Sequence, residues 1–558
     1  MLVHLAKIFD FVADNLPQHE AFIWRDRRLT YRELQERSHR AGNAILSWGF
    51  GRHTAPAKLK PWESGHDHVA LYMYNCNEYL EAAYGAYFAR AVPINVNYRY
   101  VAEELIYVLK NSNSRAIVFH ASLAPRLREI RDQLPELEHF VQVDDGSGEP
   151  LLEGAVEYES WLAAQSTMLP GLPYSPDDLY ILYTGGTTGL PKGVVWRQED
   201  VYYNGLGGHL PGFPRIESEE MLRDHINAGL GGRPVVCSPF MHGAGHWTSF
   251  NTFHRGGTVI LPDEARRLDP HSVWAAVQRH KVDALGLIGD SFALPLLQAL
   301  KEKSYDTSSI RILVSTAAVL SASVRKELLS YLPDGVMVIE SVGASEAGLQ
   351  AMSYDTQSKY AGIPAYDLRE GTVLLNHERS GTLDPATARR GADGDVGWIA
   401  TGGNLPLGYL GDPDKTLATF PVINGKRYCV GGDRACFSEE GRVLFLGRES
   451  SCINTGGEKV YVEEVERVVK SHPAIVDTLV VGVPNERWGQ QVTAVVTLAP
   501  GEAAPSVKDL RTHCATHLAD YKLPRALVVA PEIVRSPSGK PDYAWAKKFA
   551  ADANRSGR

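Results

Sequence analysis

The chain has few cysteines, no long uncharged apolar run and no excess of positive charge, and each shortage argues against a class of protein. Its six cysteines in 558 residues include no CxxC pair, so we expect structural, reduced thiols in the cytoplasm rather than disulfides or zinc ligands. The formal net charge of −9 at pH 7 argues against the clustered basic residues of a nucleic-acid-binding protein. No stretch reaches the roughly 18 apolar residues that a transmembrane helix requires.

Residues 1–17 have apolar side chains at helical spacing, but they include His4, Lys7, Asp10 and Asp14. They lack the uninterrupted apolar core of a secretory signal peptide, so we expect no export. Peripheral contact between a folded surface and a membrane stays open, and so does a homodimer.

The pattern along the chain predicts an α/β fold with more than one domain, because 558 residues exceed the usual domain size of roughly 100 to 200 residues. Strand-like runs alternate with helical patterns such as TYRELQERSHRAGNAILSWG and SVRKELLSYL. The strand-like runs are HVALYMY, RAIVFH, LYILYT, GTVILP and RILVST. Residues 51–67 are polar and predict an exposed loop. From Leu444 onward a strand, a Gly-rich turn, a helix and a strand predict a smaller α+β domain.

The segment TGGTTGLPKG, residues 184–193, is typical of a loop that binds a triphosphate. Its glycines let the backbone approach phosphate oxygens, while its threonines and lysine add hydroxyl donors and a positive charge. The residues assigned to this loop are Thr184, Gly185, Gly186, Thr187, Thr188, Gly189 and Lys192. Pro191 and Gly193 flank the lysine, so the segment departs from the Walker A pattern. The plain alternative is a surface turn rich in Gly and Thr.

Six segments in order resemble the adenylate-forming enzymes, the superfamily of acyl-CoA synthetases, adenylation domains of peptide synthetases, and luciferases. They include LTYRELQERSHRAGNAI near the start, the phosphate loop, VSTAAVLS, ESVGASEAG, the run YCVGGDRACFSEEGRVLFLGRE and SPSGKP near the end. The resemblance covers nearly the whole chain. It implies a large N-terminal domain of several subdomains with mixed sheets and helices (1–447), a hinge (448–450) and a small mobile α+β C-terminal domain (451–558).

The resemblance assigns VSTAAVLS and ESVGASEAG to the nucleotide. The residues that it places near the adenine and the α-phosphate are Thr316, Ala317, Ala318, Val342, Gly343 and Ser345. Glu346 is the implied Mg²⁺ ligand, since this hard cation prefers carboxylate and phosphate oxygens. Val342 departs from the family, which commonly has an aromatic residue there to stack on adenine.

Three further charged residues receive roles from the resemblance. Asp433 is implied to accept hydrogen bonds from both ribose hydroxyls, and Arg448 to reach ribose or phosphate oxygens. Taken alone, Asp433 in a Gly-rich turn would more often form a structural Asx turn. Ser450 replaces the Asp or Lys that the family usually has at its hinge. Lys540 is the implied adenylation lysine, which bridges the substrate carboxylate and the α-phosphate.

The acyl and CoA sites rest on shorter patterns. The segment PFMHGAGHWTSF places His242, Trp247 and also Gly343 at the implied acyl pocket. His246 lies four residues after His242 without the Glu of HExxH, so we expect pocket polar groups or buried histidines and no zinc. Gly456, Gly457 and Glu458 are implied to face the pantetheine arm of CoA.

The resulting hypothesis is an ATP-dependent acid:CoA ligase that uses ATP, Mg²⁺ and CoA, forms an acyl-AMP and then an acyl-CoA. The chain looks most like bacterial long-chain and steroid side-chain acyl-CoA ligases in its segments GGTTGLPKGVVW, MHGAGHW and INTGGEKVY. A fatty, terpenoid or steroid side-chain carboxylic acid is therefore expected. Two alternatives stay open. The acyl group could pass to a carrier-protein thiol, or the protein could bind nucleotide without catalysis.

Overall fold

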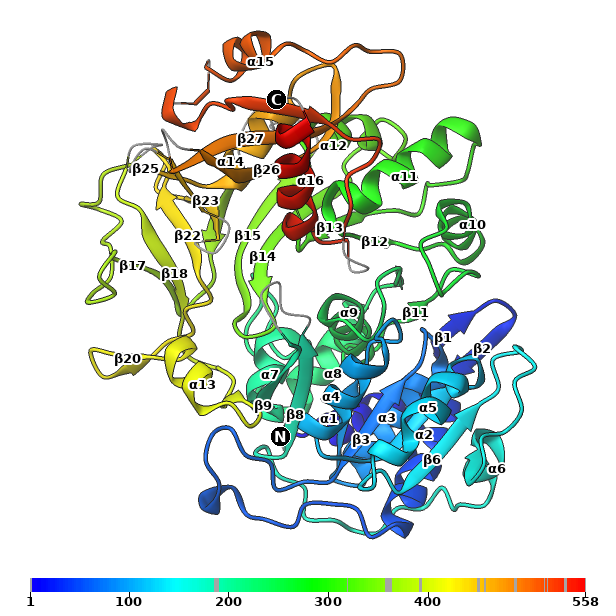
Figure 1. The fold of residues 1–558 in the computed structure, drawn as a ribbon. Helices are drawn as coiled ribbons and strands as arrows, with labels where there is room; N and C mark the ends of the chain where they lie inside the picture. Colours follow the sequence, from blue (N-terminus) through cyan, green and yellow to red (C-terminus); the bar gives the residue numbers. More distant parts are fainter. Residues whose placement is uncertain are drawn as a thin grey trace.

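The computed structural model describes residues 3–184, 190–318, 320–356, 364–390, 394–448, 452–455, 458–485, 489–515, 517–518, 520–535 and 539–556. They form a large N-terminal domain and a small C-terminal domain, which Figure 1 shows in orange and red at the top. The predicted α/β class is confirmed. Within these residues no helix combines the length and the apolar character needed to cross a membrane.

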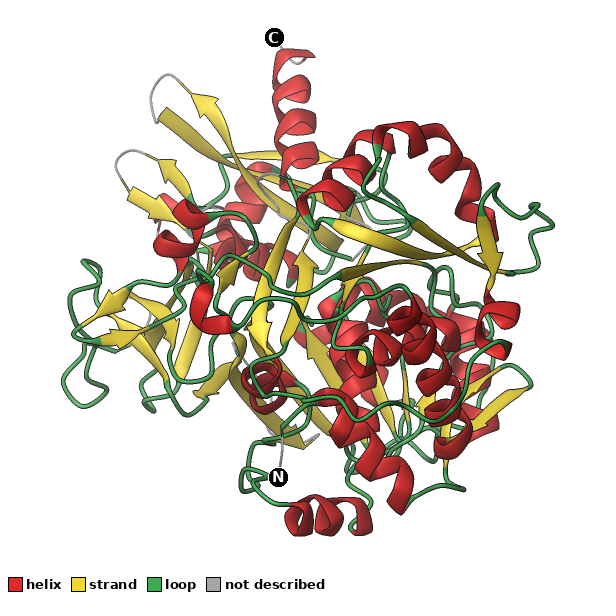
Figure 2. Cartoon of the chain, turned by 90° about the horizontal axis from the view of Figure 1, so that it is seen from below, coloured by secondary structure: helices red, strands yellow, loops and turns green. Residues whose placement is uncertain are grey.

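The largest sheet runs through the N-terminal domain and joins segments that are far apart in the chain. Its strands, in spatial order, are β17 (Thr372–Leu375), β18 (Gly397–Thr401), β22 (Asp433–Phe437), β23 (Val443–Arg448), β16 (Ala365–Leu368), β15 (Gly348–Thr356), β14 (Met337–Ala344), β13 (Ile312–Thr316), β12 (Ala284–Leu287), β10 (Pro234–Val235), β11 (Val259–Ile260), β1 (Glu20–Trp24) and β2 (Arg27–Thr30). From β11 to β14 the neighbours are parallel, whereas from β14 to β18 they are antiparallel. Figure 2 shows this strand-rich part on the left, with few helices.

Two further sheets support the predicted phosphate strand. The parallel sheet consists of β4 (Val92–Asn95), β3 (His68–Tyr72), β5 (Ser114–His120), β6 (His139–Val143) and β7 (Ala155–Glu157). The antiparallel sheet consists of β19 (Gly408–Tyr409), β9 (Lys192–Arg197) and β8 (Leu179–Thr184). A short hairpin joins β20 (Val422–Ile423) and β21 (Lys426–Arg427). The predicted strands HVALYMY, RAIVFH, LYILYT, GTVILP and RILVST correspond to β3, β5, β8, β11 and β13.

The helices of the N-terminal domain pack around these sheets. They are α1 (Leu5–Asn15), α2 (Tyr31–Ser47), α3 (Asn77–Phe88), α4 (Ala102–Asn111), α5 (Ala124–Ile130), α6 (Tyr158–Ala163), α7 (Gln198–Gly205), α8 (Glu219–Asn227), α9 (Gly243–Phe253), α10 (Pro270–His280), α11 (Gly289–Glu302), α12 (Ala322–Leu329) and α13 (Pro413–Thr419). Helix α2 begins where predicted because Thr30 and Glu33 form a reciprocal capping box. Helix α3 has every residue buried, which places it in the centre of the core.

The C-terminal domain has its own sheet and its own apolar core. Its strands are β24 (Ile453–Thr455), β25 (Glu458–Val460), β26 (Ile475–Asn485), β27 (Gly489–Leu498) and β28 (Ala526–Val529), and its helices are α14 (Val462–Lys470), α15 (Val507–Cys514) and α16 (Tyr543–Ser556). Helix α14 presents Val462, Val465 and Val469 to the sheet. The predicted smaller α+β unit is therefore present and separately packed, but the first strand of the predicted segment, β23, belongs to the large sheet of the N-terminal domain.

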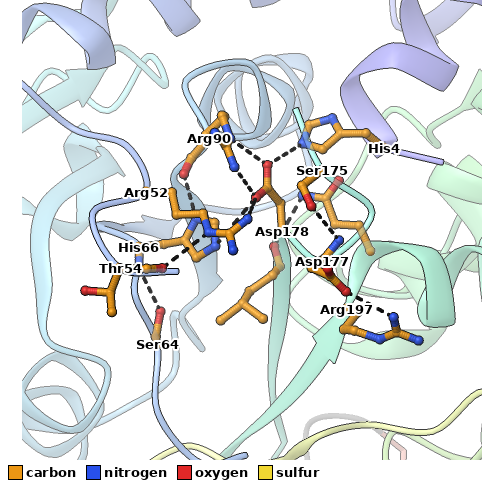
Figure 3. A network of polar contacts seen from close by, with 12 residues as sticks. His4, Arg52, Thr54, Ser64, His66, Arg90, Ser175, Asp177, Asp178 and Arg197 are labelled. Carbon is orange, nitrogen blue, oxygen red and sulfur yellow. Dashed lines mark hydrogen bonds and ion pairs between the residues drawn. The ribbon is translucent and has the colours of Figure 1, made fainter. Parts of the chain in front are cut away.

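A buried carboxylate, Asp178, anchors the start of the phosphate strand β8 (Figure 3). Arg90 donates two hydrogen bonds to it at 2.6 and 2.8 Å, and Arg52 donates one at 2.9 Å. The His4 ring lies 3.3 Å away, just before α1. Although burial raises the pKa of Asp178, Arg90 and His4 hold it well below its ordinary value. The predicted polar loop is exposed in its middle, but Arg52 near its start is drawn inward to this carboxylate.

We expect Asp178→Asn to lower the free energy of unfolding by about 3–5 kcal/mol, because two buried guanidinium groups would lose their carboxylate. Urea titration of the purified variant measures this. Asp177→Asn is the matched control, since Asp177 pairs with Arg197 at the more exposed surface, and its unfolding midpoint should stay near that of the parent. Equal midpoints for the two variants would contradict the anchoring role of Asp178.

Candidate active site

The predicted phosphate loop joins two paired strands. Strands β8 and β9 are antiparallel, and Thr184, the last residue of β8, lies opposite Lys192, the first residue of β9. The residues between them that were assigned to phosphate, Gly185, Gly186, Thr187, Thr188 and Gly189, lie outside the described residues. The register nevertheless places Thr184 and Lys192 together at the two ends of the loop.

Lys192 and Glu346 are connected through two residues that the sequence analysis missed. The Lys192 ammonium donates to Asp412 at 2.8 Å and lies 5.5 Å from the centre of the Tyr409 ring. The Tyr409 hydroxyl donates to Glu346 at 3.0 Å. Burial and the nearby Glu346 carboxylate raise the pKa of Tyr409, so the hydroxyl remains a donor. These contacts hold the implied metal ligand beside the implied phosphate lysine.

The implied nucleotide segments lie side by side because β13 and β14 pair in parallel, with Thr316 opposite Ser341. Ala317 has a positive φ of 63° at the end of β13, where the chain turns sharply past Ala318. Gly343 is constrained by packing, since a Cβ there would lie 2.6 Å from the Gly348 carbonyl oxygen. The structure therefore brings together the two segments to which the resemblance assigns the nucleotide.

Ser345 and Glu346 follow β14 in the turn to β15, and a side chain of β9 fixes the backbone of this turn. The Trp196 indole, on β9, donates to the Ser345 carbonyl at 3.1 Å. A Cβ added at Gly243, the first residue of α9, would lie 3.6 Å from the Ser345 hydroxyl. The turn is thus packed between the phosphate strands and the start of α9.

A small cavity adjoins the adenine segment at Ala318 and Ser341. Tyr366 on β16 and Phe445 on β23 line it, together with Glu340 and Arg467. Burial raises the pKa of Glu340 to about 7, against the opposing effect of Arg325. The sequence analysis missed these aromatic side chains because no local pattern connects them to the adenine segment.

Asp433 and Arg448 lie directly opposite each other on the antiparallel strands β22 and β23. The Asp433 side chain is buried, with 3% of the residue exposed. The Arg448 side chain lies outside the described residues. The implied ribose pair is therefore brought together at the level of strand register.

The two histidines of the implied acyl segment have different environments. His246 is buried, its ring stacks on Phe250 at 4.4 Å, and burial lowers its pKa to about 3. It belongs to the core. His242 precedes α9 and is half-buried; burial, then the charges of Lys540 and Arg99, lower its pKa to about 4. Of the two alternatives for these histidines, a polar group of the pocket or a buried core residue, His246 is therefore the buried core residue.

Trp247 lies on α9 near the phosphate strand. Its indole donates to the Tyr180 hydroxyl at 2.8 Å, and a Cβ on Gly205 would lie 2.8 Å from its ring. The close approach of Gly205 fixes the orientation of the half-buried indole.

Among the described residues, no group of three or more His, Cys, Asp or Glu side chains could hold a metal ion.

Lys540 reaches this site from the C-terminal domain. After burial, its charge is the next contribution to the lowered pKa of His242. The preceding Gly539 has a φ of 78°, and a Cβ there would lie 2.7 Å from the Ser291 hydroxyl of α11. The chain therefore packs directly on the N-terminal domain just before Lys540.

The implied CoA residues are described incompletely. Gly456 and Gly457 lie outside the described residues, as do Ser450 and the rest of the implied hinge after Arg448. The backbone of Glu458 begins β25, whose residues pair with β24. Their assignment to CoA stays a prediction.

This fold and this arrangement of residues belong to a known class. Residues 9–410 match the family described as AMP-binding enzyme, and residues 464–540 match the AMP-binding enzyme C-terminal domain. The chain belongs to this family of adenylate-forming enzymes, so the resemblance on which the prediction rests is confirmed.

Particular relatives extend over nearly the full length. The chain is 43% identical over 543 residues to the medium-chain acyl-CoA ligase Mig of Mycobacterium avium, covering 97% of each chain. It is 38% identical to the 3-oxocholest-4-en-26-oate:CoA ligase of Rhodococcus rhodochrous, covering 98% of this chain and 96% of that one. The crystal structure of the anthranilate CoA ligase AuaEII in complex with anthranoyl-AMP has the same fold, with a TM-score of 0.82, 21% identity and coverage of 100% and 98%.

Proposed function

We propose that the protein is an ATP-dependent acyl-CoA ligase that converts a carboxylic acid to an acyl-AMP and then to an acyl-CoA. The packing of Gly539 against Ser291 carries this proposal, because it brings the segment with the C-terminal lysine onto the domain that holds the implied nucleotide residues. The full-length similarity to two acyl-CoA ligases supports CoA as the acceptor. A fatty or steroid side-chain acid is the substrate class that we favour, and the cytoplasm is the compartment.

In the first step a carboxylate oxygen of the acid attacks the α-phosphorus of ATP, and the bond to the pyrophosphate oxygen breaks. Lys540 bridges the acid and the α-phosphate, and it stabilises the charge that shifts between them. Lys192, held near Tyr409, neutralises the terminal phosphates. No enzyme nucleophile is needed, since the carboxylate of the acid accepts the AMP group directly.

Glu346 suits a magnesium ion because Mg²⁺ is usually bound by one or two carboxylates together with substrate phosphates. When bound, the ion would neutralise phosphate charge and polarise the phosphoryl oxygens. The Tyr409 hydroxyl orients the Glu346 carboxylate through its hydrogen bond of 3.0 Å. Trp196 fixes the backbone of the same turn through Ser345.

We place the adenine beside Ala318, at the edge of the small cavity there, and the ribose at Asp433. Tyr366 and Phe445 line that cavity, so either ring could provide the aromatic face that is missing at Val342. The nearby residues Thr316, Ala317, Gly343 and Ser345 would then contact the nucleotide, and Arg448 would reach its ribose or phosphate. Trp247 and His242 would face the acyl group.

In the second step the CoA thiolate attacks the acyl carbonyl carbon, and the bond to the AMP oxygen breaks. We propose that residues 448–450 act as the hinge between an N-terminal domain (1–447) and a C-terminal domain (451–558), and that rotation exchanges Lys540 for Gly456, Gly457 and Glu458. A carrier-protein thiol as acceptor remains the alternative. A homodimer and peripheral membrane contact stay as further proposals.

One assay tests both the reaction and the acceptor. The purified protein is incubated with ATP, Mg²⁺, CoA and a pool of short, long, aromatic and steroid-derived acids, and the products are identified by mass spectrometry. We expect an ATP-dependent CoA thioester of an apolar acid. An acyl-AMP without a thioester would favour the carrier-protein acceptor, whereas the absence of both products would contradict the ligase proposal.

A further inference from the structure

Four charged side chains form a continuous chain of ion pairs across the boundary between the two domains. Lys470, the last residue of α14, forms an ion pair of 2.6 Å with Asp290 of α11 and donates a hydrogen bond of 3.0 Å to Asp477 of β26. Asp477 also accepts two hydrogen bonds from Arg535, at 2.8 and 2.9 Å. We call Asp290, Lys470, Asp477 and Arg535 the interdomain clamp.

Asp290 is buried, the other three residues of the clamp are largely shielded from solvent, and the charges of the four balance. The exposed fractions of its side chains are 3% for Asp290, 13% for Lys470, 16% for Asp477 and 18% for Arg535. Burial lowers the pKa of Lys470, but Asp290 and Asp477 outweigh it, so that the pKa lies above its ordinary value. Lys470 is therefore charged in this arrangement, and separation of the domains would leave Asp290 without its cation.

On the N-terminal side the clamp is connected to the nucleotide segment. The other carboxylate oxygen of Asp290 accepts a hydrogen bond of 2.8 Å from the backbone of Ser321, which is the last residue of the VSTAAVLS segment with Ala317 and Ala318. Ser291, the neighbour of Asp290, receives the packing of Gly539. The first turn of α11 thus contacts both the VSTAAVLS segment, which we assign to the nucleotide, and the segment that carries Lys540.

On the C-terminal side the clamp is connected to Lys540. Arg535 forms an isolated β-bridge with Pro541, and its guanidinium makes a long hydrogen bond of 3.5 Å to the Gly539 carbonyl. Arg535 therefore fixes the backbone on both sides of Lys540.

We propose that the interdomain clamp is a set of positioning residues for acyl-adenylate formation. It holds the segment with Lys540 against the start of α11 and has no role in the transfer from acyl-AMP to CoA. The Asp290–Lys470 pair joins the two domains, whereas Lys470, Asp477 and Arg535 belong to the C-terminal domain and move with it. This inference rests on the proposed ligase function.

The test compares the two half-reactions in Asp290→Asn, which removes the charge but keeps an oxygen for Ser321. Pyrophosphate release is measured with ATP, Mg²⁺ and dodecanoate in the absence of CoA, and thioester formation with dodecanoyl-AMP and CoA. We expect the first rate to fall by between about 10- and 100-fold, since a small displacement of a catalytic group has effects of this size. The second rate should be unchanged. Lys470→Gln tests the same pair from the other domain if Asp290→Asn folds poorly.

Lys522→Met is the matched control, because Lys522 forms a buried pair of 2.8 Å with Glu464 inside the C-terminal domain. It should leave the ratio of the two rates unchanged. A proportional loss of both rates in Asp290→Asn, or no loss of either, would overturn the clamp proposal.

A second measurement does not depend on activity. The pair Ser291→Cys and Gly539→Cys should form a disulfide under mild oxidation, since a Cβ at Gly539 lies 2.7 Å from the Ser291 hydroxyl. Adding Asp290→Asn should slow this cross-link if the clamp holds the domains together, and an unchanged rate would contradict the clamp. If the parent protein forms no pyrophosphate with any acid but the cross-link still slows, the ligase proposal fails and the holding role of the clamp stands.

Discussion

Lys540→Ala is expected to lower the rate of acyl-adenylate formation by about 10²–10³-fold, the effect of removing one preorganised charged donor from an active site. The packing of Gly539 against Ser291 places the segment with Lys540 on the N-terminal domain, and the charge of Lys540 contributes to the lowered pKa of His242. No other residue that we assign to the α-phosphate carries a positive charge from the C-terminal domain.

The measurement is pyrophosphate release in the absence of CoA, combined with the affinity for ATP from calorimetry. ATP affinity should change little, because Lys192 and Asp433 remain in place. Lys548→Ala, which removes an exposed lysine of α16, is the control and should match the parent. Normal adenylation by Lys540→Ala would remove Lys540 from the catalytic role.

The site residues that the sequence analysis proposed lie in short segments. Thr184 is the last residue of one strand and Lys192 is the first residue of the strand paired with it. The pattern around them predicts a phosphate loop from local composition alone. Asp433 and Arg448 are separated by a hairpin, so a modest distance in sequence becomes direct opposition in the sheet. Relations between residues this close in sequence can be predicted without knowledge of the tertiary structure.

The residues that the sequence analysis missed depend on pairings between distant strands. Tyr409 reaches Glu346 because β19 pairs with β9, which is more than two hundred residues earlier in the chain. Phe445 reaches the adenine segment because β23 adds to the sheet beside β16. Neither pairing leaves a periodic signal near the residue itself. The replacement at Val342 was visible in the sequence, whereas the two aromatic rings that line the cavity at Ala318 and Ser341 were not.

The same limit applies to the boundary between the domains. A change of pattern after Leu444 predicts a second folding unit, because its helix and strands alternate on a shorter scale. The pairing of Asp290 with Lys470 at 2.6 Å has no such signature, since a single Asp and a single Lys on separate helices look like ordinary surface charges. Burial gives them their importance, and burial is a property of the assembled domains.

Glu346→Gln is expected to lower the rate of adenylation by about 10²–10³-fold, which corresponds to the loss of several kcal/mol of charge stabilisation through the metal ion. An amide oxygen is neutral and a weaker Mg²⁺ ligand than a carboxylate, so the Mg²⁺ concentration that gives half of the maximal rate should rise. Tyr409→Phe keeps the carboxylate but removes the hydrogen bond of 3.0 Å that orients it. Its rate should fall by at least about 10-fold, as for other partners of metal ligands.

Titration of the initial rate with Mg²⁺ at fixed ATP separates these effects. Glu327→Gln, which removes an exposed carboxylate paired with Lys301, should reproduce the parent curve. The Mg²⁺ concentration that gives half of the maximal rate should rank the three variants. Glu346→Gln should need the most Mg²⁺, Tyr409→Phe an intermediate amount and Glu327→Gln no more than the parent. A Glu346→Gln variant with an unchanged Mg²⁺ dependence would place the metal elsewhere, because a direct ligand cannot lose its charge without weakening the ion that it binds.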